Sequence, residues 1–163
     1  MSKKSTVLPL LVLMAMATPA LANPRGASPD DVRAVEQASA RFYEALNALF
    51  TGDAAPMGEV WSHADDVTYM GPAGGFQVGW SEVRGIWRSQ ADLKRGGKVE
   101  PADVHVAVGQ DLAVVQCTEV GQNFDAQGQP VQVSIRATNV FRNEGGEWKM
   151  IGHHTDLLPF LKK

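Results

Sequence analysis

Cysteine is nearly absent from this chain of 163 residues, since Cys117 is the single one. One cysteine cannot form an internal disulfide, so the fold does not depend on that cross-link. Cys117 lies in the apolar stretch 112–120, where a small buried residue is its simplest interpretation. The CxxC, HExxH and GxSxG motifs, the phosphate-binding loop and the spaced GxGxxG are also missing. The sequence therefore gives no motif for thiol redox, zinc hydrolase, serine hydrolase or nucleotide chemistry.

An excess of basic residues is missing too. The chain carries 15 Lys and Arg against 18 Asp and Glu, a formal net charge of −3. It has no electrostatic footprint for nucleic acid or for an anionic membrane surface. We therefore expect neither nucleic acid nor a membrane as a partner.

The amino terminus has the features of a secretory signal peptide. A basic start precedes an apolar run over residues 7–17 that is too short to span a bilayer, and Ala20-Leu21-Ala22 supplies a cleavage site. No Arg-Arg pair precedes the run and no cysteine follows the site, which favours the general secretory route without a lipid anchor. We predict a signal peptide over 1–22 and a secreted protein in the bacterial periplasm, with no membrane anchor after cleavage.

Three helices are predicted next, in a single domain over 29–160 that follows a polar leader, 23–28. The first runs from Pro29, capped by Ser28, to a stop at 51–53. A short helix covers 53–61. The third is capped by Ser81, ends at 94–97 and carries Leu93 on its buried face.

Strands are predicted elsewhere in the domain. Two short ones, 67–70 and 76–78, lie between the second and third helices. After residue 98 the apolar period becomes two, which predicts long strands at 104–108, 112–120, 131–142 and 147–155. Helices grouped before a mainly antiparallel sheet indicate an α+β fold.

This order and three stretches resemble the nuclear-transport-factor-like superfamily, in its SnoaL-like branch related to ketosteroid isomerases. The stretches are 61–72 with Gly75-Phe76 and Gly79-Trp80; Arg136-Ala137-Thr138 through Val140-Phe141-Arg142 to Gly145-Gly146; and 147–154. The resemblance implies a cone-shaped, strongly curved sheet wrapped around the helices, with a pocket between them and a homodimer formed through the open sheet face. Members isomerise, dehydrate, open epoxides or close rings, and others only bind ligands or assemble.

The adjacent histidines near the end of the last strand are the main candidates for chemistry. Their side chains point to opposite faces of a strand. Alternation places His154 with Trp148, Met150 and Gly152, and the resemblance implies that this last-strand histidine faces the cavity. We assign His154 as a candidate catalytic acid or base; a hydrogen-bonded structural role is the alternative. His153 is expected to face outward or into a subunit interface.

Tyr69 and His63 are two further catalytic candidates. The Tyr69 hydroxyl could donate to a developing oxyanion, or the side chain could simply pack with its tip hydrogen-bonded. His63 precedes Asp65 and Asp66, so it could be an oriented base or could cap its loop.

Arg136 is the candidate anion contact. If it faces inward, a substrate carboxylate could pair with its guanidinium; if outward, it is solvated or contacts a second subunit. The length of the turn around 144–146 decides this, and one bulge reverses it.

Four other residues are assigned to ligand binding. Trp61 and Trp87 are core or cavity wall, and Glu119 and Asn139 are polar residues within sheet strands. A buried Glu119 would need a partner or a raised pKa. No metal site is indicated, because His153 and His154 cannot readily share an ion from opposite strand faces.

The leading hypothesis is a small-molecule pocket that binds an apolar carboxylate- or carbonyl-bearing compound. Any reaction is expected to be isomerase or lyase chemistry without a cofactor. The alternatives are a non-catalytic binding or oligomer-forming module with a vestigial pocket, and a carrier of periplasmic metabolites.

Overall fold

A computed structural model describes residues 27–156. The predicted signal peptide, residues 1–22, lies outside the described residues. So do most of the leader and the last four residues of the predicted domain, 157–160.

The elements follow the predicted order. They are α1 (Pro29–Phe50), α2 (Ala55–Val60), β1 (Thr68–Met70), β2 (Gln77–Val78), α3 (Trp80–Asp92), β3 (Lys98–Val108), β4 (Leu112–Phe124), β5 (Pro130–Glu144) and β6 (Glu147–Asp156). Three helices and a mainly antiparallel sheet confirm the α+β prediction. The long strands extend beyond the predicted bounds, because paired backbone continues past the end of apolar alternation.

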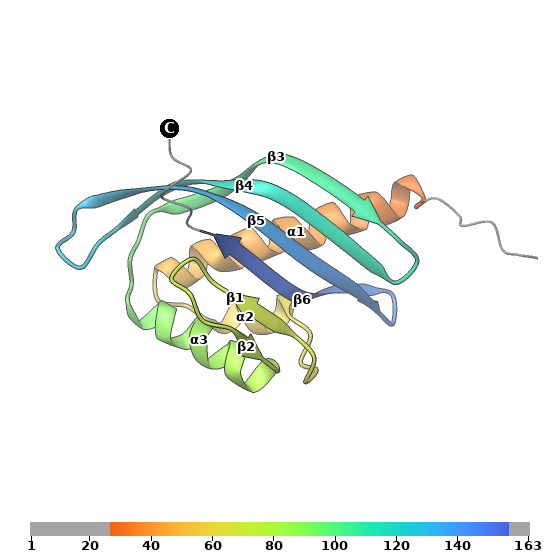
Figure 1. Ribbon diagram of the computed structural model, residues 1–163, viewed down its shortest axis with the longest axis horizontal. Coiled ribbons are helices and arrows are strands. Elements are labelled where there is room, and N and C mark those ends of the chain that lie inside the picture. Colours follow the sequence, from red (N-terminus) through yellow and green to blue (C-terminus); the bar gives the residue numbers. More distant parts are fainter. Residues whose placement is uncertain (1–26, 157–163) are drawn as a thin grey trace, which may run out of the picture.

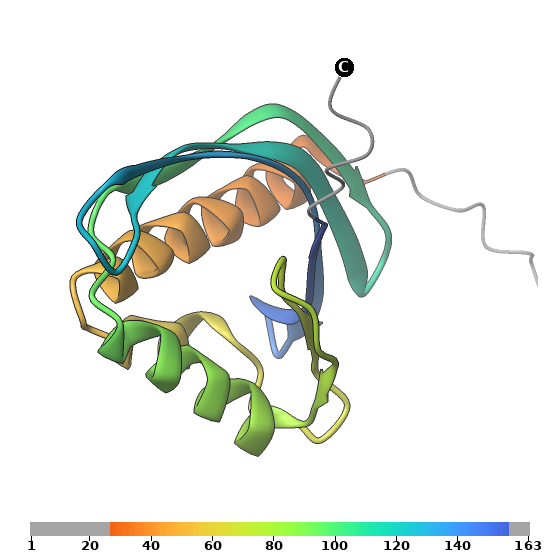
Figure 2. The same ribbon diagram turned by 60° about the vertical axis from the view of Figure 1, so that its left-hand side comes forward.

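The six strands form one sheet in the order β2-β1-β6-β5-β4-β3. All neighbours are antiparallel except β1 and β6, which run parallel. The sheet curves over α1, and α3 lies on the open side opposite the long strands (Figures 1 and 2). This is the predicted cone, with its interior between the concave sheet face and the helices.

Helix α1 starts with a capping box. The Ser28 hydroxyl accepts from the Asp31 backbone N–H at 3.1 Å, and the Asp31 carboxylate accepts from the Ser28 N–H. Eight buried residues form its inner stripe: Val35, Ala38, Ser39, Phe42, Tyr43, Ala45, Leu46 and Leu49. The stripe packs into the concave face, so one polar ring, that of Tyr43, is delivered to the interior.

Asn47 fixes the far end of α1 against the sheet. Its side-chain amide donates to the Val99 carbonyl at 3.0 Å, and its oxygen accepts from the Val99 N–H at 2.9 Å. The pair completes the backbone hydrogen bonding of Val99, a buried residue of β3. The two bonds therefore fix the distance between this end of α1 and the sheet.

Two details of the predicted third helix are wrong. The helix starts at Trp80, after Gly79 at φ 86°, so Ser81 lies inside the first turn and is not the cap. Backbone bonds from Gly79 N–H to Val67 O and from Trp80 N–H to Ala64 O fix the entry instead. Leu93 is 57% exposed, because it lies two residues, about half a helical turn, beyond buried Ala91 and so points away from the core. Within residues 27–156, no helix is both long and apolar enough to cross a membrane.

Candidate functional site

A single β-bulge decides which histidine faces the interior. The hairpin between β5 and β6 turns through Gly145-Gly146, and its ladder pairs Phe141 with Met150. The next pair joins Val140 to Gly152, so Ile151 is an extra residue. An extra residue reverses the alternation that follows it. Trp148 and Met150 are buried before the bulge, and His153 and Thr155 after it.

His153 is therefore the interior histidine, with 5% exposure. The expected inward orientation of His154 is wrong. Its side chain is 43% exposed on the outer face, where Nε2 lies 3.2 Å from an Asp156 carboxylate oxygen. The expectation failed because strict alternation from Trp148 does not include the extra residue.

Arg136 also lies on the outer face, so the inward alternative for it is wrong. It is exposed, and the residue opposite it in the backbone register of the β5–β6 ladder is Asp156. The bulge does put Arg136 on the face of His154, but that face is the outer one. Arg136 therefore cannot contact a ligand inside the cone.

Five interior side chains form a connected group, which we call the buried cluster. The Tyr43 hydroxyl donates to Glu119 Oε1 at 3.2 Å and lies 3.0 Å from the Cys117 sulfur. Asn139 Nδ2 donates to the Tyr43 oxygen at 3.2 Å, and Asn139 Oδ1 lies 2.6 Å from His153 Nδ1. All five residues are buried. The cluster thus joins α1, β4, β5 and β6 across the interior.

Asn139 sets the tautomer of His153. Because the amide NH₂ group donates to Tyr43, the oxygen faces His153 and accepts a proton held on Nδ1. Nε2 is then an acceptor, without a hydrogen-bond partner among residues 27–156. Burial lowers the pKa of His153 from its ordinary value to about 3, with a smaller contribution from nearby His154. The imidazole is neutral at physiological pH.

Glu119 has the opposite shift. Burial raises the pKa of its carboxyl to about 7, against a smaller lowering from the Tyr43 hydrogen bond. Both features expected of a buried Glu119, a partner and a raised pKa, are present. A carboxyl with this pKa is partly protonated at neutral pH and can give or take a proton there.

Tyr69 lies on the same interior beside the cluster. Its hydroxyl accepts from Gln90 Nε2 at 2.8 Å, and its ring stacks on His153 with centroids 5.7 Å apart and planes at 12°. Burial raises the pKa of Tyr69, and the nearby charge of Glu119 adds to the rise. The hydroxyl therefore keeps its proton and can donate it in a hydrogen bond.

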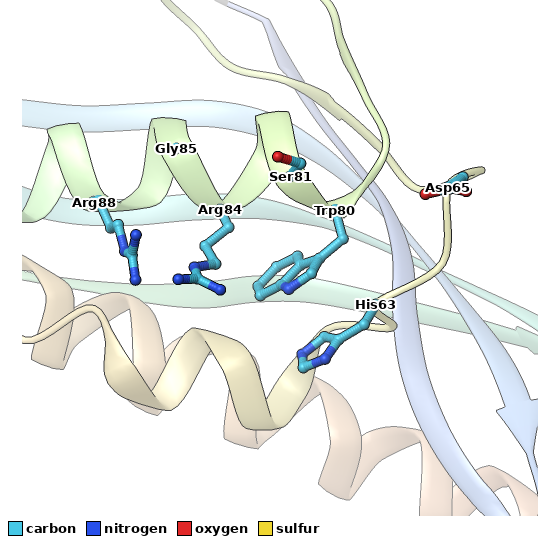
Figure 3. A pocket seen from close by; sticks show the side chains of 7 residues that line it. All are labelled: His63, Asp65, Trp80, Ser81, Arg84, Gly85 and Arg88. Carbon is cyan, nitrogen blue, oxygen red and sulfur yellow. The ribbon is translucent and has the colours of Figure 1, made fainter.

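A groove opens between α2 and α3. Two adjoining hollows of about 400 and 340 Å³ share His63, Trp80, Arg84 and Arg88 in their walls. Trp80, Arg84 and Arg88 extend from α3 towards α2, and His63 faces Trp80 (Figure 3). We call this the α2–α3 groove.

His63 belongs to this groove and not to the buried cluster. Its ring stacks on Trp80 with centroids 4.6 Å apart and planes at 7°. Nε2 lies 2.9 Å from the Gly58 carbonyl oxygen, so the exposed side chain caps the end of α2. The loop-capping alternative describes its position, and no carboxylate among residues 27–156 hydrogen-bonds to it to orient it as a base.

Trp87 separates the groove from the cluster. It lines the smaller hollow, and its ring centroid is 4.6 Å from Tyr69 and 6.1 Å from His153. Trp61 packs against it at 6.0 Å. Both indole N–H groups are buried and have no acceptor among residues 27–156. Trp61 is a core residue, whereas Trp87 is a core residue that also forms part of the groove wall.

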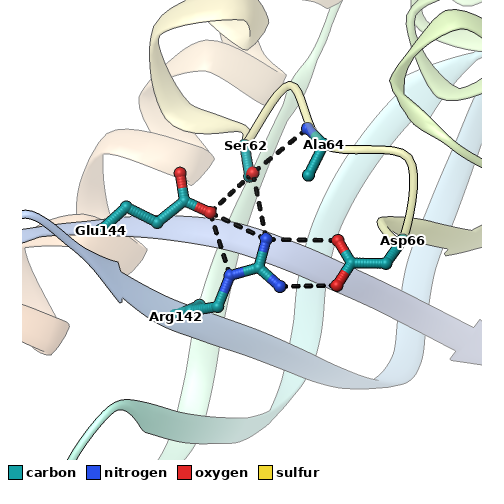
Figure 4. A network of polar contacts seen from close by, with 5 residues as sticks. All are labelled: Ser62, Ala64, Asp66, Arg142 and Glu144. Carbon is teal, nitrogen blue, oxygen red and sulfur yellow. Dashed lines mark hydrogen bonds and ion pairs between the residues drawn. The ribbon is translucent and has the colours of Figure 1, made fainter.

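An ionic clamp holds the loop that carries His63. Arg142 on β5 binds Asp66 through two nitrogens at 2.6 and 3.2 Å, and also binds Glu144 and Ser62 (Figure 4). Hydrogen bonding to Arg142 lowers the pKa of Asp66. The clamp thereby positions the loop at one end of the groove.

Several of these residues were not singled out by the sequence. Tyr43 could have been found from the i, i+4 spacing with Ser39 on the buried stripe of α1. The same spacing relates Arg84 and Arg88. Within the described residues, no three His, Cys, Asp or Glu side chains are grouped closely enough to hold a metal ion.

Comparisons with known proteins agree with this architecture. The SnoaL-like domain matches residues 35–157. A proposed dehydratase of the NTF2-like family from Streptomyces avermitilis is 28% identical, with a TM-score of 0.71 over 80% of this chain and 99% of that one. A proposed calcium/calmodulin-dependent protein kinase type II association domain from Thiobacillus denitrificans is 26% identical, with a TM-score of 0.62 over 83% and 99%.

A more distant structure shares the fold alone. It is a proposed ketosteroid isomerase from Shewanella frigidimarina, 17% identical, with a TM-score of 0.62 over 76% of this chain and 94% of that one. No curated protein matches this chain in sequence.

Proposed function

The chain belongs to the SnoaL-like domain family, and on that premise we propose that it is a cofactor-independent acid–base catalyst. It binds a small apolar carbonyl compound inside the cone and isomerises or dehydrates it. The observation that carries the proposal is Glu119, a buried carboxyl with a pKa of about 7 that accepts a hydrogen bond from the Tyr43 hydroxyl.

The three groups that this chemistry needs are all buried in the interior of the cone. Glu119 is near enough for its charge to affect Tyr69, and Tyr69 stacks on His153. One carboxyl oxygen of Glu119 accepts a hydrogen bond from the Tyr43 hydroxyl, and the other accepts no hydrogen bond from residues 27–156. A carbonyl compound held among these side chains would meet a base, a hydroxyl donor and a neutral imidazole acceptor.

The proton movements follow from these positions. The Glu119 carboxylate takes the proton from the carbon next to the carbonyl, while the Tyr69 hydroxyl donates to the oxygen that becomes an enolate. Glu119, now a carboxylic acid, returns the proton. Protonation of another carbon completes an isomerisation, and protonation of a β-hydroxyl group releases water in a dehydration. His153 accepts a hydrogen bond from the substrate and orients it.

The experiment is proton exchange followed by NMR. The full-length protein is incubated in D₂O with cyclic enones and β-hydroxyketones, and loss of the α-proton signal and product formation are recorded. We expect exchange in the wild type, with a pH profile that rises through about 7 as Glu119 ionises. Glu119→Gln should slow exchange by about 10²–10⁴-fold, the usual contribution of a general base.

Glu36→Gln is the matched control, because Glu36 is an exposed carboxylate on α1. It should leave the exchange rate unchanged. Exchange at the wild-type rate in Glu119→Gln, or no exchange of any compound by the wild type, would exclude the proposed chemistry.

A second candidate is the oligomer-forming module. The Thiobacillus denitrificans protein, a proposed association domain, supports it, and so do Leu112 and Val120, which are exposed on the outer side of β4. The homodimer proposed through this outer face belongs to either candidate. Light scattering of the full-length chain and of Leu112→Lys tests it, since a monomeric wild type would contradict any assembly.

Export is proposed as well, from the sequence of residues 1–22. Amino-terminal sequencing of the protein isolated from the periplasmic fraction of an expressing bacterium should begin at Asn23. An intact amino terminus would contradict both the signal peptide and the periplasmic location.

A further inference from the structure

Building on the proposed function, we propose that the α2–α3 groove binds the carboxylate of an aromatic acid through Arg84 and Arg88. The substrate class is then an aromatic compound with an anionic group at one end and the reacting carbonyl at the other. The anionic end stays in the groove, and the indole of Trp87 must turn aside for the carbonyl to reach the buried cluster, because this side chain separates the two.

The two arginines are cations without protein counterions. They lie four residues apart on α3, so their side chains share one face of the helix. Neither forms an ion pair with a carboxylate among residues 27–156. Figure 3 shows both pointing into the space between α3 and α2. Two adjacent guanidinium groups repel each other, and a shared carboxylate removes that repulsion through charge-assisted hydrogen bonds.

The other charged residue of the groove does not neutralise them. Asp65 lines the larger hollow, but Figure 3 places it at the far end, on its own loop and beyond His63. In contrast, Arg142, the cation that holds the neighbouring loop, is engaged by Asp66 and Glu144. The positive potential of the groove therefore comes from Arg84 and Arg88 alone among the residues named as its walls.

The other wall residues, Trp80 and His63, indicate that the ligand carries an aromatic ring. The rings of Trp80 and His63 lie parallel at 4.6 Å, which makes a flat aromatic surface at the groove. A second flat ring packs on such a surface in an offset stack. The arginines are one and two helical turns beyond Trp80, so an acid group on the stacked ring would lie towards them.

Trp87 supplies an independent sign of a ligand. It is 2% exposed, lines the smaller hollow, and its indole N–H has no acceptor among residues 27–156. A buried donor without an acceptor costs free energy, which a ligand oxygen would recover. The ring that carries this donor lines the groove and also packs on Tyr69 and His153 of the interior.

The test compares a charged probe with an uncharged one of the same shape. Binding of 2-naphthoate and 2-naphthamide to the full-length protein is measured by titration calorimetry, at low and at high salt. We expect naphthoate to bind at least about tenfold more tightly than naphthamide at low salt, because two charge-assisted contacts are added, and the difference to shrink as salt screens the charges.

The variants assign that preference to residues. The double variant Arg84→Gln/Arg88→Gln should bind the two probes equally, with the naphthamide affinity unchanged. Arg136→Gln is the control, since it removes an exposed arginine from the outer sheet face, and it should keep the preference. Equal affinities in the wild type, a preference that survives in the double variant, or no binding of either probe at millimolar concentration would each overturn the anion site.

The outcomes for the anion site and for the proposed function can be separated. An arginine-dependent preference for naphthoate without proton exchange on any carbonyl compound would support the anion site and remove the catalytic role of Glu119. Exchange that depends on Glu119, together with equal binding of the two probes, would do the reverse.

Discussion

The buried cluster and the α2–α3 groove lie on either side of Trp87, and their polar groups differ in whether they have partners within the protein. In the cluster, Tyr43 bonds to three other members and Asn139 to two, and burial shifts the pKa of Glu119 up and that of His153 down, both towards the neutral form. In the groove, Arg84 and Arg88 have no carboxylate partner among the described residues. The cluster is held in place by its own hydrogen bonds, whereas the two guanidinium groups of the groove can bond to a ligand.

This difference corresponds to two tasks in the proposed function, proton transfer and the recognition of an anion. Groups that move protons need pKa values near the working pH, and a dry interior supplies them. Groups that recognise an ion need charge that the protein has not already neutralised. The indole of Trp87 keeps the two environments apart while contacting both.

Trp87→Ala is expected to remove the barrier between the groove and the cluster, and to cause the largest loss of stability among these variants. Removal of a buried indole should lower the free energy of unfolding by about 3–5 kcal/mol. The cavity would connect the groove with the cluster, so water would reach His153 and its pKa would rise towards the ordinary value. Urea denaturation measures the stability, and NMR titration of the imidazole measures the pKa.

Trp80→Ala is the matched control for that variant. Trp80 is only partly buried and does not contact His153. It should cost less stability and leave the pKa of His153 unchanged. An unaltered His153 titration in Trp87→Ala would show that Trp87 does not separate the two regions.

The two ends of the cluster are expected to oppose each other as pH changes. The pKa of Glu119 is raised, so its stabilising contribution is complete below the unfolded value of 4.5 and is lost as pH rises through about 7. The pKa of His153 is lowered, so its contribution is complete above 6.5 and is lost as pH falls through about 3. Between pH 4.5 and 6.5 the two slopes cancel.

Single variants should expose each slope. In Glu119→Gln, stability should rise with pH between 4.5 and 6.5; in His153→Gln, it should fall between 4.5 and 7. Each change is on the order of 3 kcal/mol, since a tenfold change in proton affinity is about 1.4 kcal/mol. Urea midpoints across this range measure the slopes. Parallel pH profiles for the two variants would contradict opposite shifts in the cluster.

His154→Ala should have the smallest effect and sharpen the contrast between the two faces of β6. The side chain is partly exposed, and its one ion-pair partner among residues 27–156 is Asp156, so we expect a change within about 0.5 kcal/mol. His153→Ala, by comparison, leaves Asn139 Oδ1 without its donor and opens a cavity, which together cost several kcal/mol. Thermal unfolding of both variants measures the difference; equal losses would contradict the bulged register.

The sequence was sufficient for the fold and for part of the site. Apolar periods of 3.6 and two are local, so the helices, the strands and the α+β class could be predicted. Glu119 and Asn139 could be selected because polar residues within apolar strands are unusual. The inward histidine could not, because alternation contains no sign of the extra residue at Ile151. Tyr43 and Arg84 were missed because their neighbours come from distant parts of the chain.

The same bulge has a consequence for comparing relatives. Between Met150 and His153 the strand has one residue more than its ladder with β5 uses, so the chain could lose Ile151 and still keep an imidazole opposite Asn139. A relative with a straight last strand would have one residue fewer at this point. An ungapped alignment would then match Gly152 to that relative's interior residue, and a correct one needs a gap at Ile151.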